Sequence, residues 1–203
     1  MNTVYALLLG YVLGAVPFGL LLSLAAGKGD VRKIGSGNIG ATNVLRTGSK
    51  WLAASTLLLD LGKGYAAVYL ACILFNQPTE MPDAAWGPWP AAALGAVLGH
   101  CFPAWLKFKG GKGVATNAGV AFGLAWPIGL AYAAVWVAVL ALARISSLAG
   151  MCAVVAAAIA AVVLGEVRFV PVLAVIAVLV IFLHRENLKR LAGGTEPKIG
   201  SRK

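Results

Sequence analysis

The chain has 203 residues and a mass of 20.8 kDa; 60% of its residues are hydrophobic and only 12% are charged. Soluble domains average about 25% charged residues, and a protein this small has too much surface to remain soluble with half of that share. The mean hydropathy of +0.86 therefore excludes an ordinary soluble globule, a disordered chain and a disulfide-rich secreted module. The composition predicts an all-α integral membrane protein with a single domain, residues 1–203.

Seven apolar segments can be distinguished along the chain. The first three are separated by polar loops, and breaks at Trp126-Pro127, at 144–147 and at 165–168 divide the long apolar stretch that follows. The fourth segment is about 18 Å long at helical rise, so we expect a half-span or a re-entrant piece. The expected spans are 3–26, 51–75, 88–106, 114–125, 127–143, 148–164 and 169–184.

The distribution of basic residues predicts which side each loop occupies. With seven segments and the N-terminus outside, the loops 27–50, 105–113 and 144–147 and the C-terminal tail lie in the cytoplasm and hold 5, 3, 1 and 6 of the 17 Lys and Arg residues. Because cytoplasmic loops are enriched in Lys and Arg, this arrangement predicts a seven-helix bundle with a cytoplasmic C-terminus. A five-span bundle with two non-crossing segments has the same parity and is the alternative.

The polar loop after the first segment is rich in glycine and in neutral hydrogen-bonding side chains. It runs from Ile34 to Asn43 and is followed by Arg46. Glycine permits the positive φ angles that turn successive N–H groups into one concavity. Ser36 and Asn38 add neutral hydrogen-bonding groups beside the bidentate cation of Arg46. The loop is interpreted as a site for a small polyhydroxylated anion, with a plain flexible connector as the alternative.

The second polar loop places Lys112 among three glycines, Gly110, Gly111 and Gly113, directly before an apolar segment. The N–H groups at a helix N-terminus, together with a lysine, can bind phosphate. The loop is not a Walker A sequence, because the spacing Gly-x-x-x-x-Gly-Lys-Ser/Thr does not match and no strand precedes it. A basic turn needs only one glycine, so a phosphate site is the preferred interpretation.

Further polar residues lie at the end of the last segment and inside the second. His184 and Asn187 are three residues apart and share a helix face, although a basic, lipid-facing helix end would look similar. Asp60 and Lys63 lie within one helical turn, where ionisable groups in a membrane are costly and usually paired. They either lock the bundle or support a site, and His100 is likewise a structural or a functional histidine.

Taken in order, these residues resemble the PlsY family, the bacterial membrane-integral glycerol-3-phosphate acyltransferases that use acyl phosphate as the donor. The resemblance covers essentially the whole chain, and Asp60-x-x-Lys63-Gly64 also fits it. Its three ordered motifs are Ser36-Gly37-Asn38-x-Gly40-x-x-Asn43, Gly99-His100-x-Phe102-Pro103 with Gly110-Gly111-Lys112-Gly113-Val114-Ala115-Thr116, and His184-Arg185-x-Asn187-x-x-Arg190-Leu191-x-x-Gly194-x-Glu196.

The resemblance implies transfer of a fatty acyl group from acyl phosphate to sn-glycerol 3-phosphate. The products would be 1-acyl-sn-glycerol 3-phosphate (lysophosphatidate) and phosphate, in the first step of phospholipid biosynthesis. It also implies a seven-helix bundle in the bacterial inner membrane, a site facing the cytoplasm, and no metal or nucleotide cofactor. A separate phosphate acyltransferase would supply the acyl phosphate, and the sequence contains no nucleic-acid-binding module.

The resemblance also implies roles for individual residues, in four groups. Catalysis is expected from Ser36, His184 and Asn187. Glycerol 3-phosphate is expected to bind Ser36, Asn38, Asn43, Arg46, Lys112 and Asn187. The phosphate of the acyl phosphate is expected to bind Gly110, Gly111, Lys112, Gly113 and Thr116. The supporting residues are expected to be Asp60, Lys63, His100, Arg185 and Glu196.

The attacking hydroxyl must lose a proton, and the sequence offers few bases. The His-x-x-x-x-Asp dyad of other glycerolipid acyltransferases is absent, because Trp105 follows His100 at that spacing and Lys189 follows His184. His184 is the candidate side chain, but its basic neighbours favour its neutral form and no carboxylate stands at dyad spacing. We favour proton removal by a phosphate oxygen of the acyl phosphate, with His184 as the alternative base.

Two other functional classes are alternatives to the acyltransferase. A transporter would use ionisable residues such as Asp60 and Lys63 with a broken helix near Trp126-Pro127, but the chain shows no second half with matching interruptions. A lipid phosphatase would need a nucleophilic histidine with paired arginine and aspartate, which is not evident in the sequence.

The predicted topology can be tested by labelling. In a background without Cys72, Cys101 and Cys152, single cysteines introduced near Thr79 and Thr195 are expected to react from opposite sides of sealed vesicles, because one lies in an outer loop and the other in the tail. A membrane-impermeant maleimide measures this. Labelling of both positions from the same side would refute the seven-span arrangement.

Overall fold

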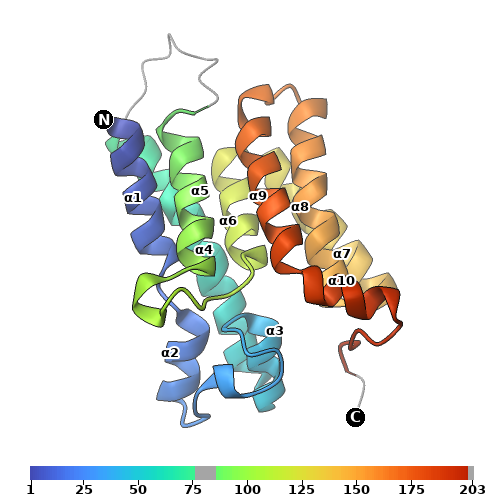
Figure 1. The fold of residues 1–203 in the computed structure, drawn as a ribbon. Helices are drawn as coiled ribbons and strands as arrows, with labels where there is room; N and C mark the ends of the chain where they lie inside the picture. The colour runs from blue at the N-terminus through green and yellow to red at the C-terminus, as the bar shows by residue number, and fades with distance from the viewer. Residues whose placement is uncertain (76–85, 201–203) are drawn as a thin grey trace.

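The computed structural model describes residues 1–75 and 86–200, and in these residues every regular element is a helix (Figure 1). Short 3₁₀ turns occur at Val31–Lys33, Leu45–Thr47, Ala104–Leu106 and Val167–Phe169. The α-helices are α1 (Asn2–Gly14), α2 (Phe18–Ala25), α3 (Ala41–Val44), α4 (Lys50–Leu74), α5 (Pro88–Cys101), α6 (Val114–Leu124), α7 (Trp126–Ala143), α8 (Ser146–Val163), α9 (Val170–Leu183) and α10 (Arg185–Ala192). Most of the expected outer loop 76–87 lies outside the described residues.

Several of these helices are long and apolar enough to cross a membrane. Four stretches qualify in the described part of the chain: α1 and α2 taken together, α4, α7 and α8. The pair α9 and α10, which is bent by 60°, would make a fifth if it counts as one span. The expected all-α integral membrane class is therefore confirmed. Crossing by seven segments, and the side on which each terminus lies, remain proposals.

Prolines determine where the expected first and third segments are interrupted. The expected single helix over 3–26 is two helices, because Pro17 lacks an N–H donor and disfavours helical geometry at Val16. The expected third segment is helix α5, which ends at Cys101 instead of reaching 106, since Pro103 follows two residues later. The break before Trp126-Pro127 occurs as expected, with Ala125 in an extended conformation between α6 and α7.

The long helices lie roughly parallel to one axis, with α1, α4 and α5 on one side of the bundle, α7, α8 and α9 on the other, and α6 between them, whereas α10 turns across this axis (Figure 1). The polar loops after α2 and α5, the α7–α8 turn and the C-terminal tail all lie at the end away from the start of α1 (Figure 1). The loops that were expected to be cytoplasmic from their Lys and Arg content thus gather at one end of the molecule.

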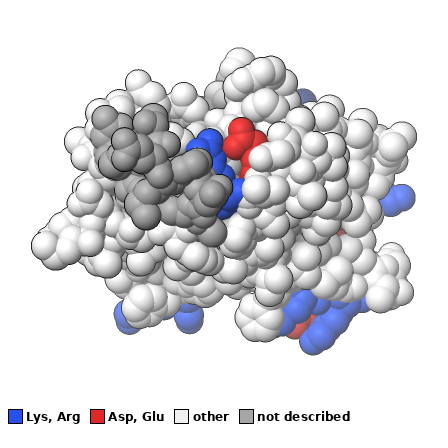
Figure 2. Space-filling model, turned by 90° about the horizontal axis from the view of Figure 1, so that it is seen from above, with Lys and Arg blue, Asp and Glu red and all other residues white. Residues whose placement is uncertain are grey.

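The opposite end carries few described charges. Seen from the end at which α1 begins, the visible surface is mostly uncharged, with one adjacent basic and acidic group on it and further basic groups at the margin (Figure 2). In the α8–α9 turn at this end, Arg168 forms an ion pair with Glu166 at 3.4 Å. The large hydrophobic side chains on the lateral surface are exposed, for example Leu142 (88%) and Val178 (70%), as expected of helices that face lipid.

Small residues allow the helix backbones to approach closely. Gly10 and Gly14 of α1 face Ala92 and Ala96 of α5, where a Cβ on either glycine would overlap the backbone of the facing alanine. Gly119 of α6 meets the α4 backbone in the same way. Lipid offers no hydrophobic drive for helix association, so close backbone packing of this kind holds membrane helices together. It brings α1, α4, α5 and α6 into fixed register.

This packing predicts a contrast between two glycine substitutions. Gly14→Ala is expected to lower the thermal unfolding midpoint in detergent, because its Cβ would overlap the Ala96 carbonyl and overpacking costs about 1–3 kcal/mol. Gly62→Ala on α4 is the matched control: a Cβ there meets nothing within 4 Å, so its midpoint should stay or rise. Equal midpoints for the two variants would contradict the close α1–α5 contact.

Candidate active site

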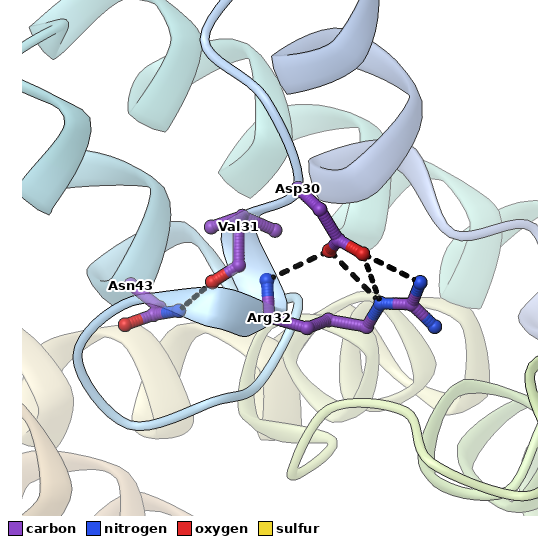
Figure 3. Close-up of polar contacts among 4 residues, drawn as sticks. All are labelled: Asp30, Val31, Arg32 and Asn43. Carbon is purple, nitrogen blue, oxygen red and sulfur yellow. Dashed lines mark hydrogen bonds and ion pairs between the residues drawn. The ribbon is translucent and has the colours of Figure 1, made fainter.

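The first polar loop is organised around the buried side chain of Asn43. Its Nδ2 donates to the carbonyl oxygens of Val31 (2.7 Å), Asn38 (2.8 Å) and Ile34 (3.1 Å), and its Oδ1 accepts from the backbone N–H of Ser36 (3.0 Å). The bond to Val31 is drawn in Figure 3. This geometry gives Asn43 the role of shaping the loop. Its expected contact with glycerol 3-phosphate remains a prediction.

An ion pair closes the start of this loop. Arg32 donates from Nε and Nη2 to the carboxylate of Asp30 at 2.9 and 2.7 Å, and the backbone N–H of Arg32 also donates to it (Figure 3). These hydrogen bonds lower the pKa of Asp30 to about 2. This pair was not predicted from the sequence. The signal was an Asp two residues before an Arg at the start of a helical turn, which is a common capping position.

The expected substrate-binding side chains of the first loop lie at its surface. Ser36 and Arg46 are exposed, and Arg46 donates from Nη1 to Oδ1 of Asn43 at 3.3 Å. The side chain of Asn38 accepts from the N–H of Gly40 at 2.8 Å and so closes a turn just before α3. Gly35, with a φ of +56°, lies so close to the Arg46 guanidinium that a Cβ would overlap it. The glycine therefore lets the loop backbone approach a cation.

The second polar loop folds back on the end of α5. The N–H groups of Gly110 and Gly111 donate to the carbonyl oxygens of Cys101 (3.1 Å) and His100 (3.0 Å). Gly113, with a φ of +83°, then starts α6. Between them stands the half-buried Lys112, whose Nζ donates to Oδ1 of Asn187. The loop thus places the ammonium group of Lys112 beside the first turn of α10.

A carboxylate organises the C-terminal part of the site. Glu196 accepts from Nδ2 of Asn187 (2.6 Å), from Oγ of Ser147 (2.6 Å) and from Nε of Arg190 (2.7 Å). Burial disfavours its charged form, but these three donors outweigh that effect and hold the pKa of Glu196 below its usual value. Because Asn187 donates to Glu196, its amide oxygen faces Lys112. Ser147, at the start of α8, carried no sequence signal beyond being polar.

Burial and the nearby Arg190 lower the pKa of Lys112 from its usual value. Its immediate partner is a neutral amide, and the carboxylate of Glu196 is one residue further away. A cation that has only a neutral partner remains available to an anionic ligand. The arrangement therefore suits the binding of a phosphate group.

His184 lies at the bend between α9 and α10 and is buried. Its Nδ1 lies 2.7 Å from the carbonyl oxygen of Val180. A carbonyl can only accept, so Nδ1 carries the proton and Nε2 of the neutral ring is the free acceptor. Among the remaining expected residues, Arg185 is exposed and stacks on the Phe182 ring at 4.8 Å, and Thr116 is buried.

The supporting residues Asp60, Lys63 and His100 come together in the interior of the bundle. Lys63 Nζ lies 2.7 Å, and His100 Nδ1 3.7 Å, from Oδ1 of Asp60. In residues 1–75 and 86–200, no group of three His, Cys, Asp or Glu side chains is arranged to hold a metal ion.

The structure joins the second and third motifs directly, through Lys112 and Asn187. The first motif is connected to the second by packing: Leu106 lies against the apolar cluster under the first loop, formed by Leu20, Val31, Ile39, Val44 and Ala53. Within the described residues, no hydrogen bond or ion pair links Ser36, Asn38 or Arg46 to the Lys112–Glu196 cluster. That these two groups share one ligand remains a prediction.

The whole chain is similar to known proteins of one family. Residues 4–194 match the family model described as glycerol-3-phosphate acyltransferase. The chain is 62% identical over 197 residues to a protein of that name from Erythrobacter litoralis, covering 97% of this chain and 95% of the relative. It is 53% identical over 199 residues to a namesake from Mesorhizobium japonicum, covering 98% and 97%.

Two solved structures are similar over the same length. One is the glycerol 3-phosphate form of PlsY (YgiH), an integral membrane glycerol 3-phosphate acyltransferase, with a TM-score of 0.89, 34% identity, and coverage of 98% of this chain and 96% of that chain. The other is the lysophosphatidic acid form of PlsY, with a TM-score of 0.85 and the same identity and coverage. The chain therefore belongs to the glycerol-3-phosphate acyltransferase family.

Proposed function

We propose that the protein transfers a fatty acyl group from acyl phosphate to sn-glycerol 3-phosphate, releasing lysophosphatidate and inorganic phosphate. The observation that carries the proposal is the Lys112–Asn187–Glu196 chain beside a glycine-rich loop, which leaves a cation with a neutral partner where a phosphate can bind. The relatives' names support glycerol 3-phosphate as the acceptor, and the solved forms of PlsY are named for glycerol 3-phosphate and for lysophosphatidic acid.

The choice of donor rests on chemistry. Phosphate is a good leaving group that is already anionic, so acyl phosphate needs no protein acid to protonate it. Acyl-CoA and acyl carrier protein are used by families with a His-x-x-x-x-Asp dyad, and neither His100 nor His184 has an aspartate at that spacing. Cationic groups that neutralise the departing phosphate are then the main requirement.

In the proposed reaction, a hydroxyl oxygen of glycerol 3-phosphate attacks the acyl carbonyl carbon. The carbon–oxygen bond to phosphate breaks, and the hydroxyl proton passes to a phosphate oxygen of the donor, so phosphate leaves carrying that proton. Arg46, with Ser36, Asn38 and Asn187, would hold glycerol 3-phosphate. Lys112 and the 110–113 backbone would hold the donor phosphate. The protein contributes proximity and cationic stabilisation.

The proposal includes the side on which the reaction occurs. The described parts of the loops that are rich in Lys and Arg lie at the end that holds both candidate anion sites. The positive-inside rule places this end in the cytoplasm of a bacterial inner membrane. Acyl phosphate would be delivered there by a separate phosphate acyltransferase.

One assay separates this function from its rivals. Purified protein in detergent is incubated with acyl phosphate, with glycerol 3-phosphate and with both, and phosphate release and lysophosphatidate are measured. Release that requires both substrates and matches lysophosphatidate mole for mole is expected. Release from one substrate alone would indicate a phosphatase, and the absence of any release would favour transport.

Arg46→Ala is expected to raise the KM for glycerol 3-phosphate by about tenfold or more, because charge-assisted bonds to phosphate are about twice as strong as neutral ones. The KM for acyl phosphate should change little. Lys28→Ala, which removes an exposed cation at the same end of the bundle, is the control and should leave both constants unchanged. An unchanged glycerol 3-phosphate KM in Arg46→Ala would remove the assignment.

His184→Gln is expected to keep kcat within about tenfold of the unsubstituted enzyme, because a side-chain base typically contributes 10²–10⁴-fold and here the donor phosphate takes the proton. Gln places an amide near the position of Nε2, whereas His184→Asn can keep only the bond to Val180 and serves as its control. A kcat loss of about a thousandfold in both, with intact KM values and a lost pH limb, would assign the base to His184.

A further inference from the structure

The glycine-rich loop of the site lies directly on a buried imidazole. A Cβ on Gly111 would overlap Nε2 of His100, and a Cβ on Gly110 would overlap the His100 backbone carbonyl. The Gly111 N–H donates to that same carbonyl at 3.0 Å. The loop is therefore held by the backbone of residue 100 and rests against its ring, one residue before Lys112.

The carboxylate of Asp60 lies on another side of the imidazole. Oδ1 of Asp60 is 3.7 Å from Nδ1 of His100, which is longer than a hydrogen bond and makes an ion pair only when the histidine is protonated. Asp60 also pairs with Lys63 at 2.7 Å. All three residues are at most 6% exposed. Buried ionisable groups in a membrane protein are costly to maintain and usually mark a functional region.

Lys63 connects this cluster to the α1–α2 break as well. Its Nζ donates to the carbonyl oxygen of Val16 at 2.8 Å, at the break between α1 and α2 that Pro17 creates. The ammonium also lies 5.7 Å from the centre of the Phe18 ring at the start of α2. Helix α2 leads into the polar loop that contains Ser36 and Arg46. One cluster thus touches the supports of both candidate anion sites.

We propose that Asp60 and His100 are positioning residues for the glycine-rich loop: Asp60 fixes the imidazole, and the edge of the ring sets the position of Gly111 and hence of Lys112. Neither residue contacts the substrate. The inference rests on the proposed function in one respect, namely that the loop binds a substrate phosphate, which is that of acyl phosphate in the assignment above.

If the proposal is right, two substitutions that each reduce activity should partly compensate each other when they are combined. Gly111→Ala introduces a Cβ against the ring, and His100→Ala removes the ring and leaves the loop unsupported. Each alone should raise the KM for acyl phosphate more than it lowers kcat. In the double variant the Cβ occupies space that the ring has vacated, so kcat/KM should exceed that of Gly111→Ala by about tenfold.

Gly110→Ala is the matched control, because its Cβ would meet the backbone of residue 100, which His100→Ala leaves in place. No recovery is expected in the Gly110→Ala/His100→Ala pair. A harmless Gly111→Ala, or a double variant no better than Gly111→Ala in activity and thermal midpoint, would overturn the proposal. Equal recovery of the Gly110 and Gly111 variants would also overturn it, since that would show general loosening.

The part played by Asp60 has its own test. Asp60→Asn should raise the KM for acyl phosphate in the same direction as His100→Ala, and adding it to His100→Ala should raise that KM no further. An ion pair that only stabilises the fold would lower the thermal midpoint without changing KM, and this result would exclude Asp60 from positioning.

Thermal midpoints of all variants are measured beside the kinetics. If the unsubstituted enzyme fails to use acyl phosphate, the donor assignment is wrong. The recovery of thermal stability in the Gly111→Ala/His100→Ala variant then still decides whether the ring and the loop are coupled.

Discussion

Close approach of helix backbones is the constraint on which the site depends. Lipid does not drive helices together, so α1, α4, α5 and α6 associate where glycine lets one backbone touch another. The same contacts fix the ends of α5 and α6, between which the glycine-rich loop must close. No strand occurs in residues 1–75 and 86–200, so the position of the loop follows from the helix ends that flank it and from the residues on which it rests.

Asn43 in the first loop and Glu196 in the C-terminal part of the candidate site are satisfied by groups close to them. Asn43 binds three carbonyl groups of the first loop, and Glu196 accepts from three side chains that come from α8 and α10. A half-satisfied network in a low-dielectric setting is costly, whereas a complete one is rigid. Each loop is therefore shaped before a ligand arrives, which reduces the ordering that binding must impose.

The sequence allowed prediction of the parts that depend on local pattern: the all-α membrane class, the break at Trp126-Pro127, and the loops in which glycine, lysine and asparagine cluster. It did not reveal contacts between residues distant in the chain. Ser147 is 49 residues from Glu196, and nothing near it indicates that partner. Asn43 was expected to face a ligand because its type and motif suited one, but only the folded loop shows that its amide is engaged internally.

The placement of Glu196 is compatible with the proposed anion site. Direct pairing with Lys112 would neutralise the cation, and an arriving phosphate would have to displace the carboxylate. Asn187 stands between them, accepting from Lys112 and donating to Glu196. The amide thereby orients Lys112 and Glu196 without placing the carboxylate directly on the ammonium group, while Nε of Arg190 donates to the second carboxylate oxygen. The carboxylate orders the cluster, and in the proposed function the Lys112 ammonium, which has no direct carboxylate contact, binds the phosphate.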